Sequence, residues 1–90
     1  MRRVLPFDVE QAAFALLGYG EHERSMVCNR WIEQAEIAHR YFKRFGEAHA
    51  LWGTGALAEV VPRFRVTLGR VAARDRYSAM EVVFRCLTNK

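Results

Sequence analysis

The feature that most constrains the fold is a run of twenty-five residues, 21–45, without proline or glycine. Apolar residues recur in it at spacings of three and four, the periodicity of a helix with one buried face. Acidic residues begin the run, basic residues end it and Gly46 follows, so the charges complement the helix dipole at both ends,. We predict one long helix from Glu21 to Phe45, with a buried stripe of Val27, Trp31, Ala35, Ala38, Phe42 and Phe45.

A shorter helix is predicted near the N-terminus. Asp8 and Gln11 have the spacing of a capping box, which satisfies unpaired amides where a helix starts,. The helix should therefore run from Val9 to Leu17, with Gly18 as the left-handed residue that ends it. Its inner face would consist of Val9, Ala13, Leu16 and Leu17.

The C-terminal residues predict another amphipathic helix, from Arg76 to Thr88, with Asp75 as its N-cap,. Glu81 and Arg85 form a favourable pair one turn apart on its outer side. We expect the large apolar stripe of this helix to pack on the core, namely Tyr77, Met80, Phe84 and Leu87.

Between these helices the pattern is weaker. Thr54 can cap a short helix over Gly55–Val61, which Pro62 closes,. Residues 63–71 alternate as in a strand but also fit a helix, and we choose a short helix because a lone strand would have no partner. Ninety residues suffice for one core only, so the fold expected for residues 1–90 is a single all-α domain, a small bundle of four to five helices around one long central helix,.

Composition excludes several classes of protein. Apolar residues make up 51% of the chain and charged residues 27%, a composition that folds,. No apolar run is long enough for a membrane span or a secretory signal, so no membrane association is expected. The two cysteines, Cys28 and Cys86, lack the spacing of a metal knuckle or a redox pair,. We interpret them as buried free thiols, which fits a reducing cytoplasm.

No arrangement of residues points to catalysis or to a cofactor. Glu36 and His39 have the spacing of a di-metal bundle motif, but only one copy is present, and the three histidines are scattered,. Neither Cys28 nor the serines lie in a nucleophile motif. The prediction is therefore a protein without enzymatic activity, metal or cofactor.

Basic and aromatic residues alternate from His39 to Phe45, a combination that can bind a phosphate backbone and stack bases,. Helical geometry assigns Phe42 and Phe45 to the buried stripe, which leaves Tyr41 between exposed arginines. We therefore favour a core face with a solvated outer face over a nucleic-acid site in this segment.

An arginine cluster follows Pro62 and is opposed only by Asp75, within a chain whose net charge is +4. Arginine forks suit phosphate and carboxylate alike. However, twelve of the fourteen basic residues are arginine, so the residue type itself indicates little. The candidate anion or nucleic-acid contacts are Arg63, Arg65, Arg70, Arg74 and Arg76.

The segment from Arg40 to Leu57 resembles a family of short uncharacterised alphaproteobacterial proteins. The matching positions are Arg40, Tyr41, Gly46, Ala48, His49, Trp52, Gly53, Gly55 and Leu57, with a looser match at Arg2, Val4, Leu5 and Asp8. The resemblance implies a helical bacterial cytoplasmic protein and no particular chemistry. Residues 62–76 depart from the family, where a proline-rich acidic loop would be expected.

Within that segment, Trp52 is expected to anchor a loop on the core while His49 hydrogen-bonds a free backbone group at a neighbouring helix end. Besides serving as a structural clamp, such a loop can bind a partner, and its candidate residues are His49, Trp52, Gly53 and Gly55,.

The aromatic residues indicate the function that we favour. Five of them exceed what the predicted stripes need, namely Phe7, Phe14, Tyr19, Tyr41 and Trp52. Surface of this kind is often covered in an assembly. We therefore predict a non-enzymatic protein–protein interaction module, whose partner is another protein or a second copy of the chain. The alternative is a small helical nucleic-acid-binding protein that uses the arginine cluster.

Overall fold

The computed structural model describes residues 1–62 and 73–89, and within them the chain forms four α-helices and no strand. They are α1 (Pro6–Leu16), α2 (Glu21–Phe45), α3 (Leu57–Val60) and α4 (Ala73–Thr88). The predicted all-α bundle is confirmed. The short helix predicted over residues 63–71 lies outside the described residues.

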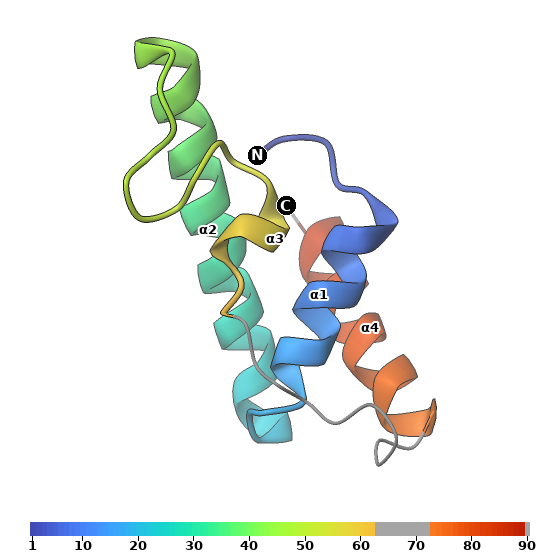
Figure 1. The fold of residues 1–90 in the computed structure, drawn as a ribbon. Helices are drawn as coiled ribbons and strands as arrows, with labels where there is room; N and C mark the ends of the chain where they lie inside the picture. The colour runs from blue at the N-terminus through green and yellow to red at the C-terminus, as the bar shows by residue number, and fades with distance from the viewer. Residues whose placement is uncertain (63–72, 90) are drawn as a thin grey trace.

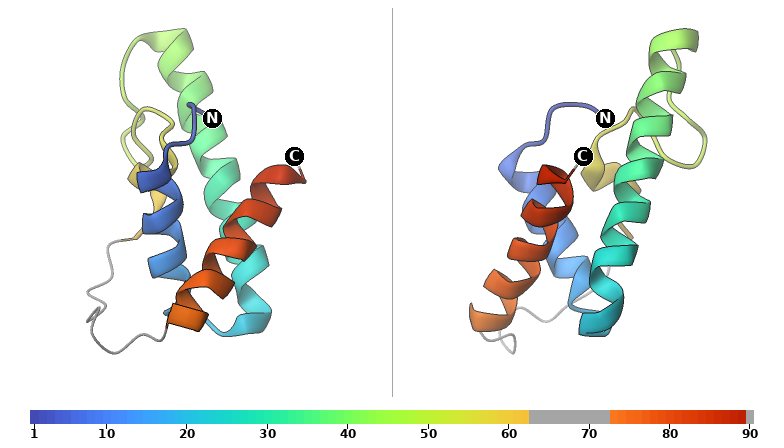
Figure 2. Two further views of the ribbon diagram at one scale, coloured as in Figure 1. Left: turned by 90° about the vertical axis from the view of Figure 1, so that its right-hand side faces the viewer. Right: turned by 180° about the vertical axis from the view of Figure 1, so that it is seen from behind.

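Three long helices and one short one build the bundle. α4 packs along α1 and also against α2, while α3 packs on both α1 and α2 (Figure 1). The three views place α1 and α4 side by side (Figure 2). The C-terminal part of α2 extends past the other helices, so α2 is a spine that its neighbours cover over only part of its length.

The core lies where α1, α2 and α4 meet, with α3 closing one end. Trp31 is 5% exposed and meets the edge of the Tyr19 ring at 5.9 Å, so its predicted place in the core is confirmed. The largest side chains that are completely buried come from all four helices and are Leu16, Ile32, Leu57, Val83 and Cys28.

The bounds of α2 agree with the prediction, but the extent of its buried stripe does not. Gly46 adopts the left-handed conformation (φ 71°), and its amide bonds the Phe42 carbonyl, which ends the helix. Phe42 and Phe45 are exposed, contrary to the prediction. They continue the stripe in sequence, but they belong to the last turn of α2, and the C-terminal end of this helix extends beyond the other helices.

α1 begins earlier than predicted. It starts at Pro6, whose fixed φ suits the first helical position, and Asp8 lies inside the first turn,. The Asp8 carboxylate accepts a hydrogen bond from the Leu5 amide at 2.8 Å, so the predicted box with Gln11 is wrong. Gly18 is not left-handed either; the helix ends through Leu17 in the right-handed region.

α4 begins at Ala73 rather than Arg76, which places Asp75 within its first turn, and its buried face differs from the predicted one. Ala79, Val83 and Cys86 are buried, whereas Tyr77 is 70% and Phe84 53% exposed. Small side chains on one face let the helix backbone approach α1 and α2 closely, because packed helices are separated by the side chains at their contact. Of the predicted stripe, Met80 and Leu87 are partly buried against the core, and Tyr77 and Phe84 are left on the outside.

α3 is shorter than the predicted Gly55–Val61 helix. Thr54 does not cap it. Instead, the Glu59 carboxylate accepts hydrogen bonds from the Thr54 amide at 2.8 Å and from its hydroxyl at 2.7 Å. This contact folds the preceding loop back onto the helix.

Candidate functional site

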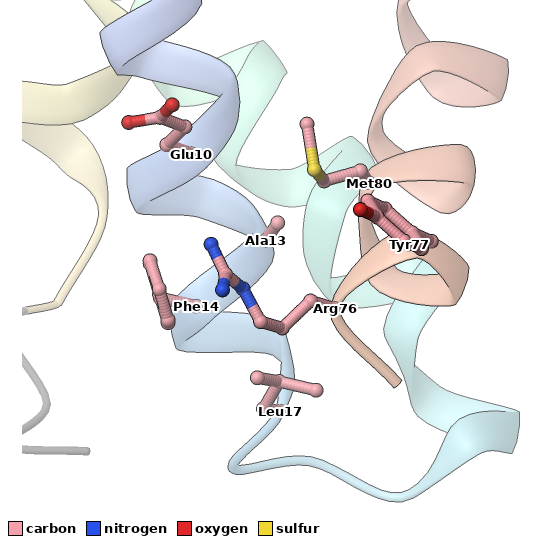
Figure 3. Close-up of a pocket in the computed structure, with 7 residues that line it drawn as sticks. All are labelled: Glu10, Ala13, Phe14, Leu17, Arg76, Tyr77 and Met80. Atoms are coloured by element: carbon pink, nitrogen blue, oxygen red, sulfur yellow. The ribbon is translucent and has the colours of Figure 1, made fainter. Parts of the chain in front are cut away.

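A groove runs between α1 and α4, and the outer stripe of α4 lies along it. The groove has two adjoining hollows, of about 220 and 390 Å³, which share Glu10 and Met80 in their walls. Figure 3 shows the first hollow, with side chains from the two helices facing each other. The first hollow is completed by Ala13, Phe14, Leu17, Arg76 and Tyr77, and the second by Val4, Leu5, Pro6, Val9, Phe84 and Leu87.

The groove is largely apolar, and part of its lining faces solvent. Leu5, Tyr77 and Phe84 are all exposed large hydrophobic residues. On α4 the spacing from Tyr77 to Met80, Phe84 and Leu87 is three, four and three residues, which is the seam spacing of helices that pack on a partner helix,. The groove is therefore a built apolar surface rather than a set of scattered exposed residues.

Two opposite charges lie on opposite walls of the groove. Glu10 belongs to α1 and Arg76 to α4, and neither pairs with an opposite charge within residues 1–62 and 73–89. The Arg76 guanidinium instead lies over the Phe14 ring, 5.4 Å from its centroid (Figure 3). A cation over a ring face is attracted by the ring but keeps donors available for a further partner.

The predicted partner-binding loop has a definite structure. His49 and Gly53 form a two-residue antiparallel bridge, with N···O distances of 2.8 and 3.0 Å. The Nδ1 atom of His49 accepts hydrogen bonds from the amides of Leu51 at 3.1 Å and Trp52 at 3.2 Å. His49 thus bonds backbone groups of its own loop, rather than a helix end as expected.

Trp52 stacks on His49 instead of anchoring in the core. The two rings are 4.8 Å apart and tilted by 6°, and Tyr41 of α2 meets His49 edge-on at 5.2 Å. Tyr41 also contacts Phe45 at 4.7 Å. These four rings form one continuous series from α2 into the loop, which we call the ring row: Phe45, Tyr41, His49 and Trp52.

Both predicted loop glycines are required by the backbone. Gly53 has φ 75° and Gly55 φ 106°, and a side chain on Gly55 would lie 2.7 Å from the Cα of His39. A side chain on Gly53 would collide with the Glu59 carboxylate. The structure therefore brings together His49, Trp52, Gly53 and Gly55. Backbone conformation and close packing explain why the two positions are glycine.

The N-terminal segment fastens the same loop from the other side. The Arg2 amide bonds the Gly55 carbonyl at 3.1 Å, and its guanidinium bonds the Thr54 hydroxyl at 2.8 Å and lies 4.0 Å from the Glu59 carboxylate. His39 lies under this loop. Its pKa is lowered by desolvation and then by the positive charges of the N-terminus, Lys43 and Arg2.

The arginine cluster is only partly described. Arg63, Arg65 and Arg70 lie outside the described residues, whereas Arg74 and Arg76 are exposed near the start of α4. Arg76 reaches into the groove rather than standing free. The role of the cluster in anion or nucleic-acid binding stays a prediction.

The two cysteines meet inside the bundle. Cys28 of α2 and Cys86 of α4 are buried free thiols, as predicted, and the Cys86 thiol donates a hydrogen bond to the Ser25 carbonyl at 3.7 Å. Burial first, and then the neighbouring Cys86, raise the pKa of Cys28 to about 12. A thiol held in its protonated form is a poor nucleophile.

Sequence reasoning missed the groove and the ring row. The signal for the groove was present, since Ala79, Val83 and Cys86 form a second apolar stripe on α4 beside the bulky one. When a helix has apolar residues on two faces, one face can pack on the core and the other can contact a further partner. The ring row had no such signal, because loop residues 47–56 carry no periodicity.

Comparison with known proteins identifies a family of unknown function. The family model described as a domain of unknown function (DUF7742) matches residues 2–87. No curated protein and no solved structure matches the chain. Among the described residues there is no helix with the length and apolar character needed to cross a bilayer, and no group of three or more side chains suited to hold a metal ion.

Proposed function

The chain belongs to the family of the domain of unknown function DUF7742. We propose, from the surface of the protein, that it is a non-enzymatic module that binds a protein partner through the α1–α4 groove. We expect it to act in the reducing cytoplasm, since both cysteines are free thiols,.

One observation carries this proposal, namely the outward stripe of α4. Tyr77 and Phe84 are mostly solvent-exposed although Ala79, Val83 and Cys86 already supply the helix with a buried face. Large exposed apolar patches on small proteins mark interaction sites. An apolar groove between two helices receives the apolar face of a further helix, with anchors at spacings of three and four residues.

The charges in the groove favour a second copy of the chain as the partner. A two-fold interface uses the same patch on both subunits, so a residue that contacts another is contacted by it in return. Glu10 on one wall and Arg76 on the other would then pair reciprocally, Glu10 of each copy with Arg76 of the other. The apolar linings of the two grooves would meet between these pairs.

Sedimentation at increasing protein concentration tests self-association. We expect a concentration-dependent dimer that Phe84→Asp weakens at least tenfold, because a carboxylate would be buried at the seam. Met26→Asp is the matched control, since Met26 is 58% exposed on α2 and does not line the groove. Circular dichroism checks that each variant retains its helices.

A charge exchange identifies the contact. Glu10→Arg and Arg76→Glu should each weaken the dimer, and the two together should restore it. A wild-type protein that stays monomeric at millimolar concentration would exclude self-association but leave other partners. A photo-crosslinking residue placed at Tyr77 in cells, yielding no crosslink to any protein, would then contradict the proposed function as a whole.

A further inference from the structure

The C-terminal end of α2 carries a surface that the groove does not use. Here the helix extends beyond its neighbours, and residues 46–56 fold back along it (Figure 1). The ring row lies on this part of the molecule, with Phe45 57% exposed and Tyr41 also exposed. His49 and Trp52 are partly buried and hold the loop end of the row in place through their stacking.

Positive charges flank the ring row. Arg40, Lys43 and Arg44 are exposed on the same end of α2, and none of them pairs with a carboxylate in the part of the chain that the structure describes. The Arg44 guanidinium lies 5.5 Å from the centroid of the Phe45 ring. Desolvation first, and then the positive charges of the N-terminus, Lys43 and Arg2, lower the pKa of the nearby His39.

We propose that this surface binds single-stranded nucleic acid, with bases stacking on Phe45 and Tyr41 and phosphates pairing with Arg40, Lys43 and Arg44. Non-specific binders of single strands combine these two elements, aromatic platforms for the bases and cations along the backbone. The inference is independent of the proposed function, because no residue of the ring row lines the α1–α4 groove.

The position of Arg44 favours a nucleic acid over a lipid surface. Phe45 is the most exposed ring of the row, and a guanidinium lies across it. Inserting this ring among acyl chains would desolvate the charge beside it, which is costly. A nucleotide engages both groups at once, because its base stacks on the ring while its phosphate accepts hydrogen bonds from the guanidinium.

Single strands fit better than duplexes for a related reason. Ring stacking needs bases with a free face, and paired bases inside a duplex do not offer one. The rings of Tyr41 and Phe45 are 4.7 Å apart and joined at a tilt of 48°. They offer a short stacking surface for bases. Recognition of duplex DNA instead commonly inserts a helix into the major groove of the nucleic acid.

Fluorescence anisotropy with labelled twelve-nucleotide dT and rU strands tests the proposal, using the full chain at about 50 mM salt. Three phosphate contacts predict that log affinity falls with log salt at a slope of roughly −2. Replacing Arg40 and Arg44 with glutamine should reduce this slope by about 1.4. Arg30→Gln, an exposed α2 arginine before the extended end, is the control and should change it little.

The rings are tested separately from the charges. Phe45→Ala should weaken binding about 5- to 150-fold without changing the salt slope, and Phe45→Trp should restore it, since stacking contributes about 1 to 3 kcal/mol per base. Phe7→Ala removes a similarly exposed ring on α1 that belongs neither to the ring row nor to the groove, and it should leave affinity unchanged.

Three results would overturn the inference. The first is no binding to either strand at about 50 mM salt and micromolar protein. The second is binding that survives Phe45→Ala and the glutamine variants but is lost on Arg74→Gln with Arg76→Gln, which would locate the contact in the arginine cluster. The third is binding to phosphatidylserine vesicles or polyglutamate but to neither strand.

Discussion

A hydrogen bond of 3.1 Å from the Ala58 amide to the Asp8 carboxylate joins two helix N-termini that are fifty residues apart. The other carboxylate oxygen accepts from the Leu5 amide at 2.8 Å, so one buried side chain caps both α1 and α3. A carboxylate at a helix N-terminus also interacts favourably with the helix dipole. Asp8 is therefore the polar link that fixes the short helix α3 on the bundle.

Asp8→Ala should destabilise the protein by about 2 to 4 kcal/mol, because it leaves two amides without their partner in a buried site. Asp8→Asn should cost less, since one amide oxygen can still accept a bond. Urea unfolding followed by circular dichroism measures both, with Glu47→Ala in the exposed loop as the control. A loss below about 0.5 kcal/mol for Asp8→Ala would show that the two bonds contribute little.

The sequence predicted α2 well because local signals there agree with one another. Its first and last turns carry the expected charges, and Gly46 supplies the left-handed end. For α4 the local signal was ambiguous, since two apolar stripes lie side by side on one helix. Which stripe is buried depends on how closely α1 and α2 approach, and periodicity alone does not contain that information.

The sequence indicated which residues form the candidate loop, but not which groups their side chains contact. Trp52 was expected on the core and His49 at a helix end, but the two rings stack on each other, and Tyr41 meets the His49 ring edge-on. Phe45 was assigned to the core because the α2 stripe continues through it in sequence. How far the neighbouring helices extend along α2 is set by tertiary packing, so its exposure could not be predicted from the pattern.

Gly55→Ala should destabilise the fold by about 2 to 5 kcal/mol. The positive φ costs a residue with a side chain about 1 to 2 kcal/mol, and overpacking against the His39 backbone adds about 1 to 3 kcal/mol,. Gly20→Ala is the matched control, because nothing lies within 4 Å of a Cβ there and its φ is −64°. Thermal unfolding of the two variants should differ clearly; equal melting temperatures would contradict this account.

The two tryptophans should differ in their contribution to stability. Trp31→Ala removes a ring from the core and should cost about 3 to 5 kcal/mol,. Trp52→Ala removes a ring that stacks on one side only and should cost about 1 kcal/mol,. Chemical denaturation measures the unfolding free energy of both variants. If Trp52→Ala lost more unfolding free energy than Trp31→Ala, the loop rather than the helix interface would dominate the stability.

The buried thiol of Cys28 should make stability depend on alkaline pH. Burial and then Cys86 raise its pKa from 9.0 to about 12, so the folded state holds the proton over a range in which the unfolded chain releases it. The contribution of the thiol is therefore fully present below pH 9 and is lost as the pH rises from 9 towards 12, by about 1 kcal/mol per pH unit. Urea unfolding of the wild type and of Cys28→Ala between pH 7 and 10.5 isolates this effect, because every other titrating group is common to both. The difference in unfolding free energy should be constant up to pH 9 and should shrink above it. A difference that stays constant up to pH 10.5 would mean that Cys28 ionises as readily in the fold as in the unfolded chain.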